Sequence, residues 1–508
     1  MKASARPARL RYSLPHLFRI ALASLLCLVF IPRVNGQASQ PDLVLEGKVA
    51  GNQNKTYVEV PFEVPAKVHR ISVDFTYTGK DQKTALDLGI ADPERFRGAS
   101  GGNKTHFTLS ETDATPSYLP GAMPKGRWKL LISVPNIRPT EQSSYRAEIR
   151  FNSPLEEHGF ALAPLATGMR WYRGDLHMHT AHSDGSCASQ SGKNVPCPVF
   201  VTAQSAVSRG LDFIAITDHN TDSQYEAMRE LQPYFDHLLL VPGREITTFW
   251  GHFNIFGVTE YVDYRAVIQG GLDVNGILRD VRQKGGIASI NHADSPGGEI
   301  CMGCAWEPPT AVDMSLFTGV EVINGGRILL SSADFWDRQL SKGSKLTAIG
   351  GSDNHNGPSA AGGVGAIGWP TTVVEATELS VPAILDGIRH GRVFIDLTAS
   401  HDRQIDIEAR DTKTQATARM GETMQAAAGD PVAFQIHVAA CPRSTVHLFL
   451  DGGERSALPP LATTFGDEAL AFQWTSDGQP HWLRAEVRDS NGSLALVSNP
   501  IYIQPITR

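Results

Sequence analysis

Two histidines two residues apart, at the end of an apolar strand, constrain this chain more than any other feature. His177 and His179 end the segment Gly174-Asp175-Leu176-His177-Met178-His179, and Asp184 follows five residues later. Side chains at positions i and i+2 of a strand point to the same face, so the two imidazoles can converge on one metal ion. Such a pair alone is weak evidence, but signals of the same kind recur as far as His355.

The later signals also lie at the ends of apolar strands. His219 follows Phe213-Ile214-Ala215-Ile216, Glu245 ends a third strand, His252 opens a fourth and His292 closes a fifth, while Asp353-Asn354-His355 repeats the spacing of the first pair. The candidate metal ligands are therefore His177, His179, Asp184, His219, Glu245, His252, His292, Asp353 and His355. One tetrahedral zinc needs three or four protein ligands, so this set predicts two or three divalent ions.

The residue types also indicate which ions to expect. Imidazole and carboxylate ligands favour Zn, Mn or Fe over Mg or Ca, and we expect no thiolate ligand. Glu245 is the predicted bridging carboxylate, and Asp184 is the least constrained candidate because it lies in a loop. Asp218 directly precedes His219 and is predicted to orient an imidazole rather than to bind metal. The remaining histidines considered are predicted to be surface or hydrogen-bonded residues: His182, His237, His390 and His401.

The candidate ligands lie in residues 165–400, where short apolar strands alternate with helices. The expected strands are Arg173–His177, Phe213–Thr217, Leu238–Val241, His252–Val258, Ile287–Asn291, Val320–Ile323 and Leu346–Gly350, and the expected helices include Phe200–Arg209, Ser223–Gln232, Asn275–Lys284 and Ala333–Leu340. Strands that alternate with helices indicate parallel βα units, and seven of them indicate a barrel-like α/β domain. Such a barrel assembles its site from residues at the C-terminal ends of its strands.

The segments on either side read as all-β. Residues 40–155 and 405–508 alternate apolar and polar side chains in short runs, such as Arg70–Phe75 and Val432–Val438, separated by turn residues. This pattern predicts an N-terminal β-sandwich and a C-terminal immunoglobulin-like sandwich. We expect both to frame the central domain, and contact with a glycan or the cell envelope is the alternative.

The N-terminus resembles an export signal. Basic residues from Lys2 to Arg19 precede an apolar stretch, Ile20–Ile31, and Val34-Asn35-Gly36 offers a cleavage site after residue 36. An uncleaved anchor is the alternative, but the apolar stretch is too short to span a bilayer, and no longer apolar run follows. We therefore expect an exported protein, periplasmic or extracellular, without a membrane span.

The net charge limits the kind of molecule that this protein is expected to bind. Residues 1–36 hold six of the 46 basic residues and none of the 53 acidic ones, so the remainder carries 40 against 53, a net charge of −13. Such a negative net charge argues against strong nucleic-acid binding, whereas a small anionic substrate held by metal ions remains compatible with it.

The cysteines suggest two disulfides. In an exported protein, Cys187 with Cys197 and Cys301 with Cys304 could form disulfides, free thiols being the alternative, and Cys441 is expected to be unpaired.

The ordered motifs resemble a known superfamily. His177-Met178-His179-Thr180, Ser183-Asp184-Gly185, Thr217-Asp218-His219, Glu245, His292 and Asp353-Asn354-His355 are similar to the successive motifs of the polymerase and histidinol phosphatase (PHP) superfamily. Within it the chain most resembles exported metallohydrolases grouped with the carbaryl hydrolase-like (CehA/McbA) family, which also have an added β domain. The resemblance implies a distorted (β/α)7 barrel with a two- or three-metal hydrolytic site, flanked here by the two sandwiches. The Cys187 to Cys197 insertion departs from shorter members and is expected to border the pocket.

Three functions fit the motifs. The first is hydrolysis of a phosphoester, in which two ions lower the pKa of a bridging water, with Glu245, Asp353 and Arg244 as catalytic candidates. Arg244 would contact a phosphate oxygen, or form a structural salt bridge instead. The second is hydrolysis of a small carboxylic or carbamate ester by the same ions. The third is a non-catalytic role, in which the metals stabilise an envelope-binding protein.

Overall fold

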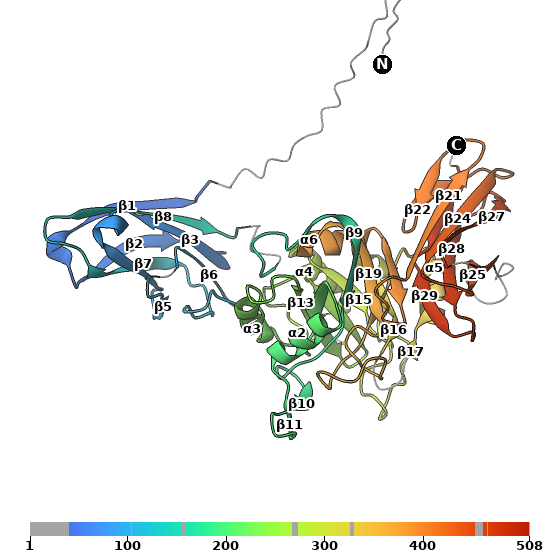
Figure 1. Cartoon of the computed structure of the whole chain (residues 1–508), viewed down its shortest axis with the longest axis horizontal. Helices are drawn as coiled ribbons and strands as arrows, with labels where there is room; N and C mark the ends of the chain where they lie inside the picture. The colour runs from blue at the N-terminus through green and yellow to red at the C-terminus, as the bar shows by residue number, and fades with distance from the viewer. Residues whose placement is uncertain are drawn as a thin grey trace, which may run out of the picture. The chain divides into compact units, whose positions relative to one another are not determined.

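The structure is a computed structural model that describes residues 40–506, apart from 103, 154–158, 267–272, 326–329, 453–460 and 465. The signal peptide predicted at residues 1–36 lies outside the described residues. Pro41–Arg508 form one compact unit, in which strands predominate (Figure 1). Within the described ranges, no helix combines the length and the apolar character that crossing a membrane requires.

The first eight strands form two antiparallel sheets. Their bounds are β1 (Leu43–Ala50), β2 (Tyr57–Val64), β3 (Arg70–Tyr77), β4 (Ala85–Ala91), β5 (Phe96–Ala99), β6 (His106–Ser110), β7 (Gly126–Asn136) and β8 (Gln142–Phe151). One sheet has the order β1-β8-β3-β6 and the other β2-β7-β4-β5. Alternate residues of both sheets, including Ile71, Phe107 and Trp128, are fully buried in one shared apolar core. Period-two burial of this kind holds two sheets face to face.

The central segment contributes the strands and helices that carry the candidate ligands. Its strands are β9 (Thr167–Asp175), β10 (Ser186–Ala188), β11 (Asn194–Pro196), β12 (Phe213–Ile216), β13 (Leu239–Thr248), β14 (Gly251–Phe256), β15 (Ile287–Ile290), β16 (Gly319–Asn324), β17 (Leu330–Ser331), β18 (Thr347–Gly351), β19 (Thr371–Glu378) and β20 (Val393–Asp396). Its helices are α2 (Val199–Ser208), α3 (Gln224–Leu231), α4 (Val274–Gln283), α5 (Ala333–Ser341) and α6 (Val381–Arg389). Each predicted strand and helix overlaps one of these elements.

The predicted (β/α)7 barrel is nevertheless wrong. Of the described residues, 42% are in strands and 12% in helices, and their five α-helices are too few for seven βα units. β12 runs parallel to β9 and β13, and β16 parallel to β15 and β18. However, β13 turns directly into β14 as an antiparallel hairpin, β14 pairs antiparallel with β15, and β19 pairs antiparallel with β9. The central strands therefore form a mixed sheet.

The sheet continues into the C-terminal strands. These are β21 (Gln404–Asp411), β22 (Thr417–Arg419), β23 (Thr423–Gln425), β24 (Pro431–Ala439), β25 (Thr445–Leu450), β26 (Leu461–Ala462), β27 (Glu468–Thr475), β28 (His481–Arg488), β29 (Leu494–Ser498) and β30 (Ile501–Gln504). β20 pairs with β29, while β22-β21-β24-β27 form a separate sheet. Phe394 of β20 lies in the same apolar core as Ile405 and Phe434, so the last strands share a core with the central segment. The domain limits predicted from the sequence stay predictions.

One C-terminal side chain holds two strands beneath the candidate site. Asn499 is buried, and its Oδ1 accepts a hydrogen bond from the backbone N–H of Ala348 at 2.7 Å. Its Nδ2 donates to the carbonyl oxygens of Ala348 at 3.0 Å and Val393 at 2.8 Å. Asn499 therefore satisfies three buried backbone groups of β18 and β20, which such groups require. β18 leads directly to two of the candidate ligands.

Candidate metal centre

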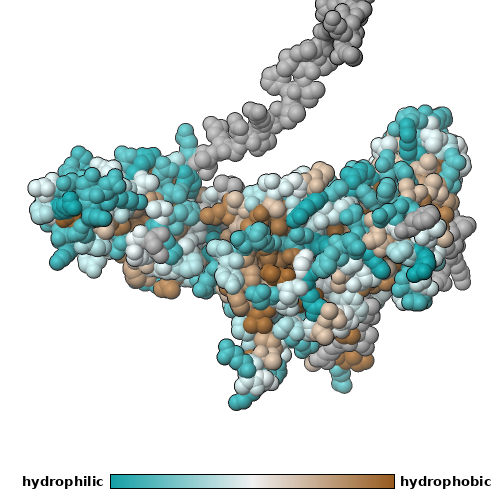
Figure 2. Space-filling model, in the orientation of Figure 1, coloured by the Kyte–Doolittle hydropathy of each residue, from teal (hydrophilic) through white to brown (hydrophobic). Residues whose placement is uncertain are grey.

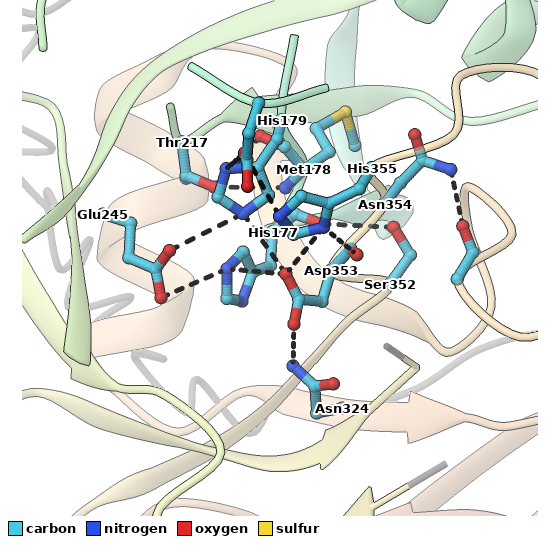
Figure 3. A network of polar contacts seen from close by, with 12 residues as sticks. His177, Met178, His179, Thr217, Glu245, Asn324, Ser352, Asp353, Asn354 and His355 are labelled. Carbon is cyan, nitrogen blue, oxygen red and sulfur yellow. Dashed lines mark hydrogen bonds and ion pairs between the residues drawn. The ribbon is translucent and has the colours of Figure 1, made fainter. Parts of the chain in front are cut away.

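The structure brings the predicted ligands together. Three groups of side chains each place one potential ligand atom per residue within 4.8 Å of one another: His177 with His179 and Glu245; His179 with Asp184, His219 and His355; and His252 with His292 and Cys304. Asp353 joins the first group through its contacts with His177 and His179. Residues far apart in the sequence thus share one polar cluster (Figure 3).

Strand ends place these side chains. His177 and His179 follow β9, His219 follows β12, Glu245 lies in β13 and Asp353 follows β18. Isolated parallel bridges between Met178 and Asn354, and between His219 and Glu245, hold these segments together beyond the strands proper.

The backbone is strained at two of the candidate ligands. His292 has a φ of 28° and Asp353 a φ of 51°, in the region that favours glycine. Strain at non-glycine residues persists where the surroundings enforce it, as they often do at functional sites. His292 comes two residues after β15, and Asp353 comes two residues after β18. The left-handed backbone conformation at these positions turns both side chains toward the cluster.

Glu245 lies at the centre of the cluster. Its carboxylate is 1% exposed and has an imidazole nitrogen within 3.6 Å of each oxygen. Oε1 lies 3.5 Å from His177 Nε2, 3.3 Å from His252 Nδ1 and 3.4 Å from His292 Nε2, while Oε2 lies 3.6 Å from His179 Nε2 and 2.8 Å from His219 Nδ1. The two oxygens face different sets of imidazoles, which is the arrangement of a carboxylate that bridges two ions.

Asp353 adds a second shared carboxylate. Its Oδ1 lies 3.3 Å from His177 Nε2, 3.2 Å from His179 Nε2 and 3.5 Å from His355 Nδ1. Its Oδ2 accepts a hydrogen bond from Asn324 Nδ2 at 3.3 Å, which fixes the carboxylate in its plane. Glu245 and Asp353 therefore approach the same pair of histidines from two sides.

Asp184 approaches from the accessible side of the cluster. Its Oδ1 lies 3.3 Å from His355 Nε2 and 3.7 Å from His219 Nε2, although its side chain is 59% exposed. The next residue, Gly185, leaves no room for a side chain, because a Cβ there would lie 2.4 Å from the carbonyl oxygen of His179. The loop is thus packed closely enough against His179 to bring Asp184 to the cluster.

The charges of the cluster are strongly coupled. Burial raises the pKa of a carboxyl group, but the imidazoles of His177 and His219 hold the pKa of Glu245 well below its usual range. Burial lowers the pKa of His177, yet the neighbouring carboxylates, Asp353 first, raise it well above the ordinary value. Burial dominates at His179 and lowers its pKa to about 4. The carboxylates are therefore ionised, and His179 is a neutral imidazole that can donate a lone pair.

Several buried polar atoms of the cluster fit metal ions. Within the described residues, the following atoms are buried and make no hydrogen bond of suitable geometry, although Glu245 Oε2 lies 2.8 Å from His219 Nδ1: Nε2 of His177, His179 and His252, Nδ1 of His292 and Oε2 of Glu245. A buried unsatisfied polar atom costs about 1–3 kcal/mol, so five in one place are unusual unless a ligand satisfies them. Imidazole nitrogens and carboxylate oxygens at these separations suit divalent zinc, manganese or iron.

The sequence did not reveal the residues that orient the ligands. Glu321 Oε1 lies 2.9 Å from His177 Nδ1, and its Oε2 accepts from the backbone N–H of His292 at 3.0 Å. The contact fixes His177 with Nε2 toward the cluster, as carboxylate partners of metal-binding histidines do. A charged residue inside the apolar strand Val320–Ile323 was the available signal.

Three further polar residues, Asn291, Thr247 and Asp175, hold the cluster in place. Asn291 Nδ2 donates to Glu245 Oε1 at 2.8 Å, and Thr247 Oγ1 lies 2.7 Å from His219 Nδ1. Asp175 is completely buried and accepts hydrogen bonds from the backbone N–H groups of His177, Ser352 and Gly368. Asp175 thereby ties the end of β9 to the loops after β18.

Two residues beside predicted ligands make structural contacts. Arg244 points away from the cluster, because neighbouring residues of a strand face opposite sides and Glu245 faces in. Its guanidinium donates to the carbonyl oxygens of Val258 and Glu260 and lies 3.8 Å from Asp222 Oδ2, which is the structural alternative predicted for Arg244. Asp218 is linked to an imidazole through Ser183, whose Oγ donates to Asp218 Oδ1 at 2.6 Å and lies 3.5 Å from His179 Nδ1. It accepts hydrogen bonds from Thr180 and Ser183 and shapes the loop that carries Asp184.

The histidines predicted to lie outside the site stay outside the three ligand groups. His182 contacts Ser223 Oγ at 2.8 Å, and His237 and His390 are largely exposed.

The cysteines pair as Cys187 with Cys197 and Cys301 with Cys304, whereas Cys441 is buried and free. Cys304 nevertheless lies beside His252 and His292, with its sulfur bonded to Cys301.

Comparisons with known proteins add little to this geometry. No family model matches the chain, and no curated protein matches it. Among solved structures, the chain is similar to a two-domain protein from Bacteroides vulgatus that contains a predicted PHP-like metal-dependent phosphoesterase. The TM-score is 0.36 and the identity 17%, over 65% of this chain and 96% of that chain. Because this likeness is distant, we base the function on the geometry of the site.

Glu321→Gln tests the orienting contact to His177. The change keeps the size of the side chain but replaces the charged partner of His177 Nδ1 with a neutral amide, so we expect zinc affinity to fall about 10- to 100-fold. Competition with a chromophoric chelator measures the affinity, and Glu307→Gln is the matched control. Unchanged zinc binding in Glu321→Gln would show that this carboxylate does not support the site.

His355 gives a prediction for the metal-free protein. Burial lowers its pKa, but Asp184 and Asp353 outweigh burial and raise it from 6.5 to about 9. The stabilisation is therefore complete below pH 6.5 and is lost as the pH rises through about 9. In chelator-treated protein, the stability advantage of the wild type over His355→Asn should shrink across this range, as urea unfolding at several pH values measures. An advantage that grows with pH would contradict the assignment.

Proposed function

We propose that this protein is a metal-dependent hydrolase of the PHP type that cleaves a phosphoester with two or three divalent ions. The observation that carries the proposal is the position of Glu245, whose two oxygens face two separate sets of imidazoles. When bound, ions in such a site activate water and draw negative charge from the reacting phosphoryl group. The ordered motifs from His177 to His355 support the same assignment.

Different residues of the chain would hold the ions, keep the ligands in position and exclude water. Glu245 and Asp353 would hold the ions together with His177 and His179, since each carboxylate contacts both of these imidazoles. Glu321 and Asn291 keep the first imidazole and the bridging carboxylate in position. The buried side of the cluster, with His177 and His179 nearly inaccessible, excludes bulk water. These groups therefore set geometry and charge before a substrate arrives.

The accessible side of the cluster favours catalysis over a purely structural role. Asp184, His355 and His219 have side-chain exposures of 59%, 32% and 27%, whereas His177 and His179 are 1% exposed or less. Structural sites are closed by protein ligands, while catalytic sites keep a position open to water or substrate. We infer that substrate enters beside Asp184 and contacts an ion held by His219 and His355.

A carboxylic or carbamate ester is the second candidate substrate. Phe249, Ile300 and Met302 are about 80% exposed, and a Cβ at Gly303 would lie 3.4 Å from both the backbone carbonyl carbon of Phe249 and His252 Nε2. These exposed apolar side chains thus belong to the two segments that carry His252 and Cys304, and the face drawn in Figure 2 shows apolar surface over the central segment. These side chains would suit an ester with an apolar group, which is the kind of substrate the carbaryl hydrolase-like resemblance implies.

We propose that the protein is exported. The disulfides between Cys187 and Cys197 and between Cys301 and Cys304 support this location, because disulfides persist in oxidising compartments. The motif-based resemblance to exported PHP metallohydrolases supports the same location. Detection of the processed chain in a periplasmic or culture fraction, beginning after residue 36, is the direct check.

A substrate panel tests the proposal. Purified protein loaded with zinc, manganese or iron should hydrolyse p-nitrophenyl phosphate or a bis-phosphodiester, and chelation should abolish the activity. We expect Glu245→Gln to lower kcat about 100-fold or more, because the ions lose their shared ligand. His390→Asn, a partly exposed histidine outside the cluster, should match the wild type. Activity on an aryl carbamate alone would select the second candidate, and full activity in Glu245→Gln would overturn both.

A further inference from the structure

A cysteine lies where the sequence predicted only imidazoles and carboxylates. One ring nitrogen of His252, one of His292 and the sulfur of Cys304 all lie within 4.8 Å of one another. The three residues are 5–6% exposed. His252 Nε2 and His292 Nδ1 are buried and have no hydrogen-bond partner within the described residues. Two imidazoles that each have an unsatisfied nitrogen, together with a nearby buried sulfur, offer the donor set of a soft metal site.

The backbone keeps these three residues together. The N–H of Trp306 donates to the carbonyl oxygen of Ala293 at 3.2 Å, and the N–H of Glu307 donates to that of Trp250 at 2.9 Å. The segment that follows Cys304 is therefore joined to the residue after His292 and to the turn before His252. Gly303 has a φ of 84°, and a Cβ there would lie 2.5 Å from the carbonyl oxygen of Thr248. A glycine at this position lets Cys304 approach the histidines.

We propose that Cys304, His252 and His292 form a sulfur-containing zinc site that exists only while the Cys301–Cys304 disulfide is reduced. Cys304 pairs with Cys301 in the structure, and a sulfur in a disulfide cannot serve as a thiolate ligand. Thiolate with two imidazoles selects zinc or cobalt over magnesium, calcium or manganese. The inference rests on the metal-dependent function proposed above and adds redox control of one of its ions.

The exposure of the two cysteines indicates which sulfur of the disulfide a reductant attacks first. Cys301 is partly exposed between the exposed side chains of Ile300 and Met302, whereas Cys304 is buried. A dithiol reductant attacks the accessible Cys301 sulfur, the S–S bond breaks, and Cys304 leaves as a thiolate beside the imidazoles. The second thiol of the reductant then closes its own disulfide and releases Cys301 as a thiol. Two electrons pass from the dithiol to the protein, and zinc binds the Cys304 thiolate.

Two serine variants separate the states. Cys301→Ser leaves Cys304 unable to form the disulfide, so it should bind the sulfur-linked ion without reductant. Cys304→Ser removes the ligand and should never bind that ion. Cys441→Ser is the matched control, because Cys441 is a free buried cysteine outside the three ligand groups. Thermal unfolding of each variant shows that it is folded.

Cobalt reports the sulfur directly. Cobalt-loaded Cys301→Ser and dithiothreitol-treated wild type should show a sulfur-to-cobalt charge-transfer band in the near ultraviolet, and each should hold one more ion than Cys304→Ser by elemental analysis. Oxidation of the wild type should remove the band, and Cys441→Ser should behave as the wild type. The reduced wild type provides the same test if Cys301→Ser does not fold.

The outcomes distinguish this inference from the proposed hydrolase. Absence of the band in both the reduced wild type and Cys301→Ser, or its persistence in Cys304→Ser, overturns the sulfur site. If the oxidised wild type still binds ions and hydrolyses substrate in that case, the hydrolase assignment stands. A wild type that binds none of cobalt, zinc, manganese and iron in either redox state overturns both.

Discussion

The buried carboxylate of Glu245, in contact with five imidazoles, is the interaction on which the rest of this structure depends. A lone ionised carboxylate at 1% exposure would be very costly, and so would several unpaired imidazoles. The carboxylate and the imidazoles lower the free-energy cost of burying one another. The surrounding imidazoles accordingly hold the pKa of Glu245 well below its usual range. Divalent ions between the carboxylate and the rings would satisfy the atoms that remain unpaired.

This requirement explains much of the surrounding fold. The strained backbone at His292 and Asp353 turns both side chains inward, and bridges at Met178 and His219 hold strand ends at ligand distance. Glu321, Asn291 and Asp175 then restrict the rings, the carboxylate and the loops. The C-terminal strands take part as well, because Asn499 pins the strand that leads to Asp353. The contacts that hold the candidate ligands in place therefore extend from the end of β9 to the C-terminal strands.

Sequence reasoning succeeded where the signal was local. The spacing of His177 and His179 and the recurrence of ligand-type residues after apolar strands located the nine histidines and carboxylates that the structure gathers, though not Cys304. It failed where the outcome depended on tertiary pairing. Apolar runs do not encode strand direction, so the antiparallel hairpin after Glu245 and the mixed sheet were missed. Glu321 and Cys304 were missed because their partners come from distant segments, and the sequence left open whether Arg244 binds phosphate or forms a structural salt bridge.

The central claim is that Glu245 joins two ions. A crystal structure of the zinc-loaded protein, with anomalous differences recorded on both sides of the zinc absorption edge, tests it most directly. The account predicts at least two anomalous peaks, each about 2 Å from a different oxygen of Glu245 and from imidazole nitrogens of the cluster. One peak alone, or peaks that leave Glu245 without a metal contact, would contradict it.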